Sequence, residues 1–156
     1  MTNNDILRRL RYVFDLPDNK MAKMFTMVDA KVEQELITSW LKKDDDPDYK
    51  SCSDVQLASF LNGFIVARRG KREGIPTPIP ETRINNNIVL RKLKIALNYQ
   101  SEDMLEIIAL AGIKFSAHEL SAFFRKEGHK HHRECKDQFM RSFFQGLTIK
   151  YRPDSK

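Results

Sequence analysis

Long apolar runs are missing from this chain of 156 residues. No stretch approaches the roughly 18 consecutive apolar residues that a membrane-spanning helix needs, so we expect no membrane segment. The opening residues, MTNNDILRRLR, lack a basic segment followed by an apolar one, which argues against a signal peptide. Two cysteines are too few for a disulfide scaffold and are typical of a reducing compartment. Together these absences predict a cytoplasmic protein.

Common catalytic and cofactor signatures are missing as well. The chain has no phosphate-binding loop, no glycine-rich dinucleotide fingerprint, and neither an HExxH motif nor a Ser-His-Asp arrangement. We therefore expect no cofactor and no bound metal, and the sequence favours a protein without catalytic activity.

What is present is an ordinary folded composition, with 41% hydrophobic and 31% charged residues. The formal net charge is +6 and the isoelectric point is near 9.4. This balance permits acidic partners, nucleic acid included, but a charge of this size is not diagnostic of them.

The second half of the chain repeats the first with an offset of 83 residues. Over residues 3–69 the alignment needs no gap and contains 14 identical pairs. The two copies open alike, with NNDILRRLR in the first and NNIVLRKLK in the second. A match of this length predicts two copies of one structural unit, at residues 1–69 and 84–152. Between them, GKREGIPTPIPETR at 70–83 has the prolines and glycines of an extended linker.

Each copy reads as four helices. Apolar residues recur at helical spacing in all of them, and no window alternates as a strand would. The expected ranges are about 4–15, from 18 onward, 33–43 and 54–69 in the first copy, and about 87–98, from 101 onward, 117–126 and 137–151 in the second. Asp18 and Ser101 are expected N-caps, and Ser116 with Glu119 forms a capping-box pattern. The predicted fold is all-α, two tandem four-helix repeats packed with pseudo-twofold symmetry.

The first helix of each copy carries the candidate binding residues. Paired asparagines stand where an N-cap belongs, and capping is the simpler interpretation. The functional alternative is that one amide of each pair faces a ligand or a base edge. Basic residues on the same helices form a solvated face or a phosphate-binding one. The candidates are Asn3, Asn4, Arg8, Arg11, Asn86, Asn87, Arg91 and Lys94.

Two further motifs are duplicated around the fourth helix. A Cys-x-Asp motif precedes it, and a small-x-x-x-Gly motif lies within it. The cysteines are best interpreted as small buried residues, because a catalytic thiol needs a base and the first copy has no histidine. The glycines predict close helix contact, either between the two fourth helices or within each copy. The candidate structural residues are Cys52, Asp54, Gly63, Cys135, Asp137 and Gly146.

The stretch HKHHREC gathers histidines and a cysteine within the second copy. Its spacing matches no standard zinc motif, and the first copy has DPDYKSC instead. A solvent-facing loop is the favoured interpretation. The alternative is an enzyme using Cys135 with His129 or His132.

The strings RINNNIVLRKLKIA, SFLNGFIVARRGK and HRECKDQFMRSFFQGL together resemble the YehS-like family of small bacterial cytoplasmic proteins. The resemblance covers essentially the whole chain. It implies a bacterial, cytoplasmic, twice-repeated helical protein of uncharacterised function, and it supplies no catalytic residues.

The expected function is a non-catalytic binding or adaptor module. The main alternative is nucleic-acid binding through the basic faces of the first helices. A protein or a nucleic acid is the expected partner, with no membrane contact, and a homodimer is a further possibility.

Overall fold

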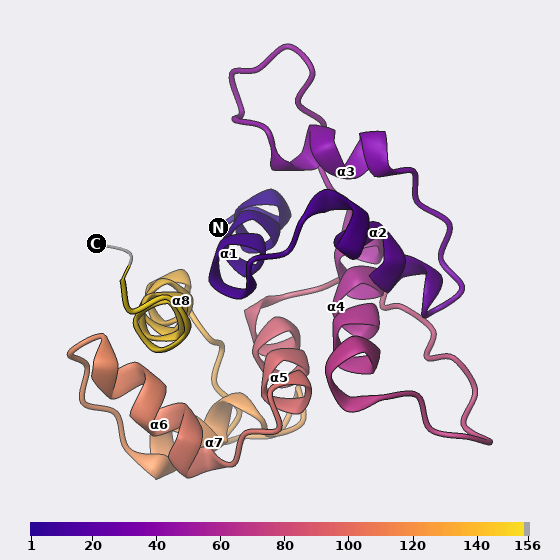
Figure 1. Cartoon of the computed structure of the whole chain (residues 1–156). Helices are drawn as coiled ribbons and strands as arrows, with labels where there is room; N and C mark the ends of the chain where they lie inside the picture. Colours follow the sequence, from indigo (N-terminus) through magenta and orange to yellow (C-terminus); the bar gives the residue numbers. More distant parts are fainter. Residues whose placement is uncertain (155–156) are drawn as a thin grey trace. The chain divides into compact units, whose positions relative to one another are not determined.

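The structure, a computed structural model, describes residues 1–154 and contains eight helices and no strand in that range. The helices in chain order are α1 (Asn3–Phe14), α2 (Asp18–Thr26), α3 (Gln34–Leu41), α4 (Asp54–Arg69), α5 (Asn86–Ala96), α6 (Ser101–Leu110), α7 (Ala117–Phe123) and α8 (Asp137–Tyr151) (Figure 1). The prediction of an all-α fold built from two four-helix repeats is confirmed.

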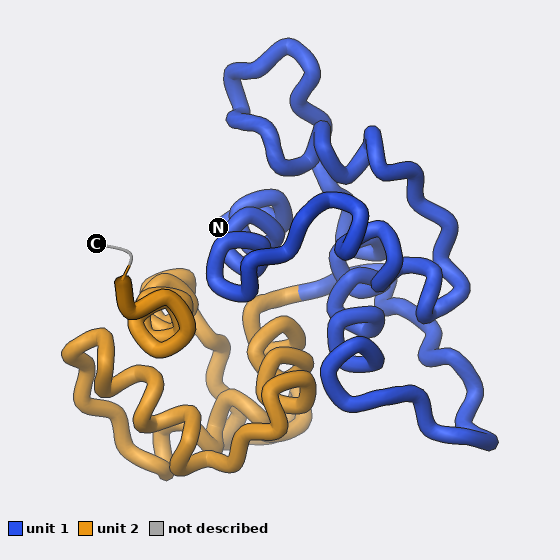
Figure 2. Tube along the Cα trace, in the orientation of Figure 1, with its two compact units in different colours: residues 1–84 blue, residues 85–156 orange. Residues whose placement is uncertain are grey.

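The chain divides into a first unit, Met1–Ile84, with α1 to α4, and a second unit, Asn85–Lys156, with α5 to α8 (Figure 2). Residues 70–85 contain no helix. Two hydrogen bonds attach this segment to the first unit: Thr77 Oγ1 donates to Asp29 Oδ2 at 2.8 Å, and the Ile84 amide donates to Asp54 Oδ2 at 3.1 Å. The predicted limits of the repeats and their pseudo-twofold packing stay predictions.

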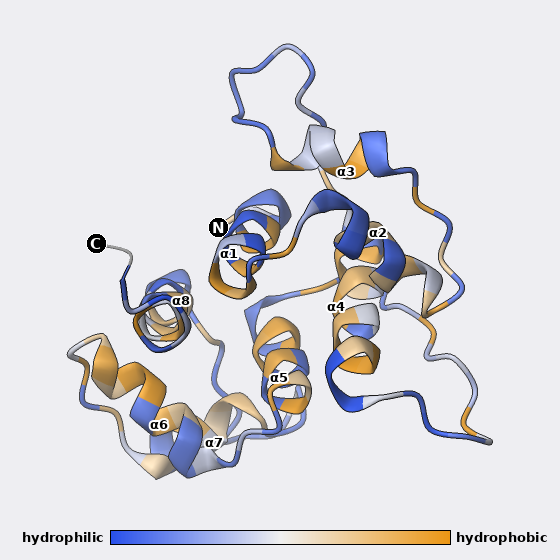
Figure 3. Ribbon diagram, in the orientation of Figure 1, coloured by the Kyte–Doolittle hydropathy of each residue, from blue (hydrophilic) through white to orange (hydrophobic). Residues whose placement is uncertain are grey.

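The fourth helix of each unit supplies much of its core. Every residue from 57 to 64 of α4 is buried, as expected of a helix covered on all sides. The first helices are amphipathic instead, and Figure 3 shows hydrophobic and hydrophilic colour side by side on α5. Leu90 and Leu93 of α5 are fully buried. Burying such a side chain stabilises the fold by about 1.5–3 kcal/mol.

Glycines let the helices of each unit approach closely. A Cβ on Gly63 of α4 would overlap the carbonyl oxygen of Met24 in α2, and a Cβ on Gly146 of α8 would overlap that of Ile107 in α6. Met24 and Ile107 are themselves 83 residues apart. The close contact therefore lies within each unit, between its second and fourth helices.

The N-caps of two helices lie one residue before the residues predicted to be caps. The N-caps of α2 and α6 are Pro17 and Gln100, so the prediction for Asp18 and Ser101 is wrong. Both of those residues are the first residue of their helix. The Ser116 capping box with Glu119 is confirmed, since each side chain accepts from the other's backbone amide.

In the part of the chain that the structure describes, no helix is long and apolar enough to cross a membrane.

Candidate functional site

The paired asparagines do not cap their helices. Thr2 caps α1 through a capping box with Asp5, and Asn85 caps α5 by accepting from the Ile88 amide at 2.9 Å. The interpretation of the pairs as caps is therefore wrong by one residue. The cap position is filled before the pair begins, which leaves both amides of each pair free to reach other segments.

The first asparagine of each pair donates hydrogen bonds to the Cys-x-Asp motif of its unit. Asn3 Nδ2 donates to the Cys52 carbonyl at 3.1 Å and to Asp54 Oδ1 at 2.8 Å. Asn86 Nδ2 makes the same two bonds in the second unit, to the Cys135 carbonyl at 3.0 Å and to Asp137 Oδ1 at 2.8 Å. The start of the fourth helix is thereby fixed against the start of the first.

The second asparagine of each pair is buried, with 1% of Asn4 and 3% of Asn87 exposed. Asn4 Nδ2 donates to the carbonyls of Trp40 at 3.0 Å and Lys50 at 2.8 Å, and its Oδ1 accepts from the Cys52 amide at 3.0 Å. One side chain thus satisfies backbone groups at the end of the third helix and on both sides of the loop that follows.

The second unit repeats this arrangement. Asn87 Nδ2 donates to the Phe123 carbonyl at 3.0 Å and to the Arg133 carbonyl at 2.8 Å, and the Cys135 amide donates to Asn87 Oδ1 at 2.9 Å. We call Asn3, Asn4, Cys52 and Asp54, and their counterparts Asn86, Asn87, Cys135 and Asp137, the asparagine clasps. Because both N–H groups and the oxygen of Asn4 and Asn87 are engaged, their geometry favours a structural role over ligand contact.

Both cysteines are buried, free thiols. Burial raises the pKa of the Cys52 thiol to about 12, and the Asp54 carboxylate adds to the rise. Burial likewise raises the pKa of Cys135 to about 12, with further contributions from Asp137 and Glu134. A thiol with such a pKa stays protonated at neutral pH, and the protonated form is neither a good nucleophile nor a metal ligand.

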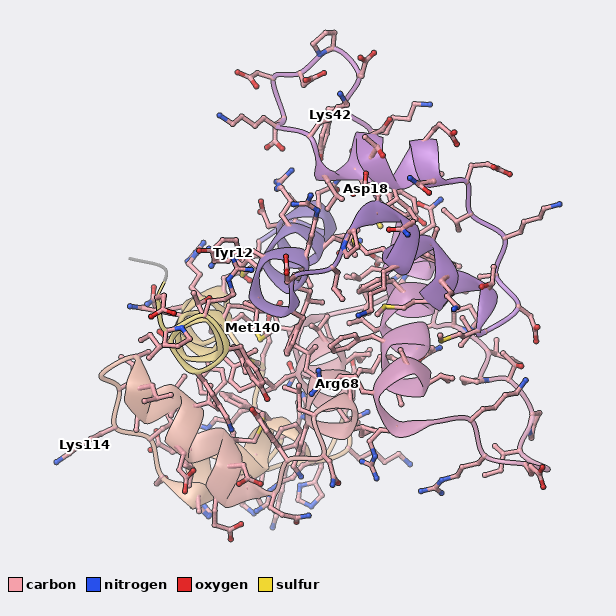
Figure 4. All side chains as sticks on the ribbon, viewed as in Figure 1. Tyr12, Asp18, Lys42, Arg68, Lys114 and Met140 are labelled. Carbon is pink, nitrogen blue, oxygen red and sulfur yellow. The ribbon has the colours of Figure 1, made fainter. Side chains whose placement is uncertain are left out.

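The candidate cations of α1 are engaged within the first unit. Arg8 donates to the Lys42 carbonyl at 2.7 Å and pairs with Asp5 at 2.6 Å and Asp44 at 3.5 Å. Arg11 lies 3.6 Å from Asp18 Oδ1. Figure 4 labels Asp18 at the start of α2 and Lys42 at the end of α3. Both arginines therefore form ion pairs with carboxylates of their own unit.

Their counterparts on α5 are less constrained. Arg91 is exposed, and Ile88 and Glu127 stand at the positions of Asp5 and Asp44. Lys94 Nζ lies 5.0 Å from the centroid of the Phe124 ring, a cation–π contact. Where Arg8 has its nearer carboxylate partner, Asp5, Arg91 therefore has the apolar residue Ile88.

Each unit has a hollow between its third helix and the loop before its fourth. The first hollow, of about 360 Å³, is lined by Glu35, Thr38, Ser39, Lys42, Pro47, Asp48, Tyr49 and Lys50. The second has a volume of about 460 Å³. Its lining includes the counterparts of seven of those residues, 83 positions on: His118, Ala122, Arg125, Lys130, His131, His132 and Arg133.

The same backbone hydrogen bonds shape the two hollows. The Lys50 amide donates to the Ser39 carbonyl at 3.3 Å, and the Arg133 amide donates to the Ala122 carbonyl at 3.0 Å. Asp46 Oδ1 accepts from the Asp48 amide at 2.8 Å. At the corresponding place in the second loop, His129 Nδ1 accepts from the His131 amide at 3.0 Å. His129 therefore closes a turn, as Asp46 does.

The remaining histidines of this loop also have structural surroundings. The His132 ring contacts the Arg125 carbonyl through Nδ1 at 2.9 Å. Among residues 1–154, no group of three or more His, Cys, Asp or Glu side chains is placed to hold a metal ion. The HKHHREC stretch is thus a loop that shapes the second hollow.

The two units differ most in charge. Residues 1–84 carry 14 basic and 13 acidic residues, whereas residues 85–156 carry 13 and 8, together with all four histidines. The second hollow follows this imbalance. Its lining has four cations, Arg125, Lys130, Arg133 and Lys136, against the two carboxylates Glu119 and Glu134.

Fold, clasps and hollows together define a class: a tandem-repeat helical protein whose copies share one polar framework and differ in the residues around it. The chain belongs to a family described as a protein of unknown function, DUF1456, whose model matches residues 3–70 and 86–152. It is similar to the uncharacterized protein YehS of Escherichia coli strain K12, with 41% identity over 150 residues and 96% of each chain covered. No solved structure matches.

Reasoning from the sequence missed the hollows and their lining residues Arg125, Lys130, Arg133 and Lys136. A hollow between a helix and a loop leaves no periodic pattern. The signal that was available is the net charge of each copy, +1 for residues 1–84 and +5 for residues 85–156 by the counts above.

Proposed function

We propose that this protein is a non-catalytic binding module. The observation that carries the proposal is that the two units share a polar framework but have differently lined hollows. The clasps and the backbone bonds of the loops recur at matched positions with nearly the same distances. The hollows beside them have different linings, which is expected where a common framework carries a recognition surface.

The chemistry of the clasps supports binding over catalysis. Each cysteine is buried and has a pKa raised to about 12, and its Sγ donates a long hydrogen bond to the next residue's carbonyl. A nucleophilic thiol needs the opposite, a lowered pKa and a base within hydrogen-bonding distance. The duplicated polar residues therefore fit a framework better than a reaction centre.

Affinity purification of the tagged full chain from its host, with and without nuclease, tests the proposal. We expect a partner to be retained in both preparations and to be lost when Lys130 is replaced by Glu in the second hollow. Replacement of the first-unit counterpart, Pro47→Glu, is the matched control and should leave retention unchanged. Equal retention by wild type and Lys130→Glu would place the recognition surface elsewhere, and a failure to retain any partner would contradict the proposal.

A second candidate function is nucleic-acid binding through the first helices. The observation that favours it is exposed Arg91 in the more basic unit. Backbone phosphates bound by arginine release counterions, so affinity falls with salt, and each lost contact lowers the slope by about one. We expect Arg91→Gln to reduce the slope for RNA by about one and Arg8→Gln to leave it unchanged, because Arg8 is already paired. A salt-independent affinity would exclude this candidate.

Two other expectations stay predictions, a cytoplasmic location and a homodimer. Light scattering during gel filtration of the full chain, at several concentrations, measures the oligomeric state directly. A mass of 18.3 kDa at all concentrations would mean a monomer.

A further inference from the structure

We infer that the hollow of the second unit binds the phosphate group of an organic phosphate such as a nucleotide. This inference rests on the proposed function and names the ligand class of one of its surfaces. The hollow lies between α7 and the loop that leads to α8.

The charge of the lining gives the first argument. Lys136 Nζ already pairs with Glu134 Oε2 at 3.1 Å, and Glu119 Oε1 accepts from the Ser116 amide in the capping box. With the Lys136–Glu134 pair set aside, three cations, Arg125, Lys130 and Arg133, face one carboxylate. Such an excess in a concave site attracts an anion, because the walls limit screening by water.

Arg125 gives the second argument. Its Nε atom is buried and has no hydrogen-bond partner among residues 1–154. A buried donor without a partner costs about 1–3 kcal/mol, so a native structure that keeps one calls for an explanation. A guanidinium offers several N–H groups in one plane and matches the oxygens of a phosphate. The guanidinium of Arg125, which lines the hollow, therefore suits a phosphate as a partner.

The rigidity of the wall gives the third argument. The Arg133 amide donates to the Ala122 carbonyl, and the Arg133 carbonyl accepts from Asn87 of the clasp. The Arg125 carbonyl is held by the His132 ring. The backbone that carries both arginines is therefore fixed before a ligand arrives, which lowers the entropic cost of binding.

The first unit serves as an internal comparison. Its hollow has two cations, Lys42 and Lys50, balanced by two carboxylates, Glu35 and Asp48. At the positions of these two carboxylates the second unit has His118 and His131. The same backbone frame thus has a neutral lining in one unit and a cationic one in the other.

The size of the hollow indicates that the ligand is more than an inorganic ion. Its volume of about 460 Å³ lies in the range of small-molecule sites, roughly 300–1,000 Å³. Phe115 also lines it and is partly exposed, with its ring packed on those of Phe123 and Phe139. A partly exposed aromatic ring beside cations suits a nucleotide, whose base can stack on the ring while its phosphate pairs with arginine.

Titration calorimetry on the full chain tests this inference, with AMP, adenosine, inorganic phosphate and a short single-stranded oligoadenylate as probes. We expect AMP to bind, adenosine not to bind, and Arg125→Gln to weaken AMP roughly tenfold or more, because a hydrogen bond to a charged group is lost. The matched control is Lys42→Gln in the first hollow, which should leave AMP affinity unchanged. Competition by oligoadenylate at a lower concentration than AMP would identify a nucleic-acid strand as the source of the phosphate.

Lys130→Gln is a second variant for the case in which Arg125→Gln does not fold, because Lys130 is exposed and its replacement leaves the core intact. It should also weaken AMP binding. If no phosphate-bearing probe binds at millimolar concentration, or if Lys42→Gln weakens AMP as much as Arg125→Gln does, the inference is overturned. Retention of a protein partner by the same preparation would then leave the proposed function standing while this inference fails.

Discussion

A buried asparagine at positions 4 and 87 provides two donors and one acceptor from a neutral side chain. In each clasp the two donors reach two carbonyls and the oxygen reaches one amide. An aspartate would direct only acceptors at those carbonyls, and a leucine would leave all three backbone groups unpaired. Each of these losses is costly in a buried site.

The clasp therefore predicts a large effect of a small change. Asn87→Ala removes the partners of the Phe123 and Arg133 carbonyls and of the Cys135 amide. We expect a loss of about 3 kcal/mol or more in the free energy of unfolding, measured with urea. Asn85→Ala, which removes only a helix cap, should cost about 1 kcal/mol. Equal losses for the two variants would show that the clasp contributes no more than a cap.

The raised pKa values of the two thiols predict how the stability of the protein depends on pH. A folded-state pKa of about 12, against the ordinary 9.0, favours the folded state as long as the thiol is protonated. This contribution is complete below about pH 9 and is lost as pH rises from there towards 12, by up to about 1.4 kcal/mol per pH unit for each thiol.

Cys135→Ala isolates the effect, because other groups titrate equally in both proteins. We expect wild type to lose stability relative to Cys135→Ala between pH 8 and pH 10.5 in urea unfolding. We also expect slow alkylation of the native protein by iodoacetamide at neutral pH. Rapid alkylation without unfolding would contradict both the burial and the raised pKa, and would favour the cysteine enzyme instead.

At the scale of elements, the packing of the second helix on the fourth decides which residue types are tolerated. Glycine inside a helix costs about 1 kcal/mol relative to alanine, yet Gly63 and Gly146 stand in α4 and α8. The reason is steric, because a Cβ at either position would overlap a backbone carbonyl of the second helix. Backbone cannot move aside as a flexible side chain can.

Gly146→Ala should consequently destabilise the protein despite its better helix propensity. We expect a loss of about 2 kcal/mol or more, since overpacking against α6 outweighs the gain. Gln145→Ala is the neighbouring control, because Gln145 is exposed on the same helix and its change should be nearly neutral. Thermal unfolding followed by circular dichroism measures both, and a stabilised Gly146→Ala protein would refute the packing argument.

At the scale of the whole molecule, the two units share a framework and differ in charge. The net charge of residues 85–156 exceeds that of residues 1–84 by four, from +1 to +5. Charge of this kind governs association with acidic partners and leaves the fold itself largely unaffected.

This difference predicts an unequal response to matched substitutions. On a heparin column, Lys130→Gln with Arg133→Gln should elute at lower salt than Lys42→Gln with Lys50→Gln, although both pairs remove two charges. The second hollow has the unbalanced cations, whereas the first balances Lys42 and Lys50 with Glu35 and Asp48. Identical elution would mean that total charge alone determines retention.

The sequence by itself determined the helices, the duplication and the all-α class. Apolar spacing and the 83-residue offset are local or linear signals, and they placed α4 and α8 at 54–69 and 137–151, where the structure has them. The glycines and the Cys-x-Asp motifs were also found, because each occurs twice.

Only the tertiary structure decided what those residues contact. Asn4 resembles a cap in sequence, and its role in holding Trp40, Lys50 and Cys52 depends on segments 36 to 48 residues away. Arg125 and Arg133 belong to the loop between α7 and α8, and only its folded path against α7 brings both into the lining of one hollow. Periodicity reports which face of a helix is buried, whereas long-range hydrogen bonds and concave surfaces form only when the chain has folded.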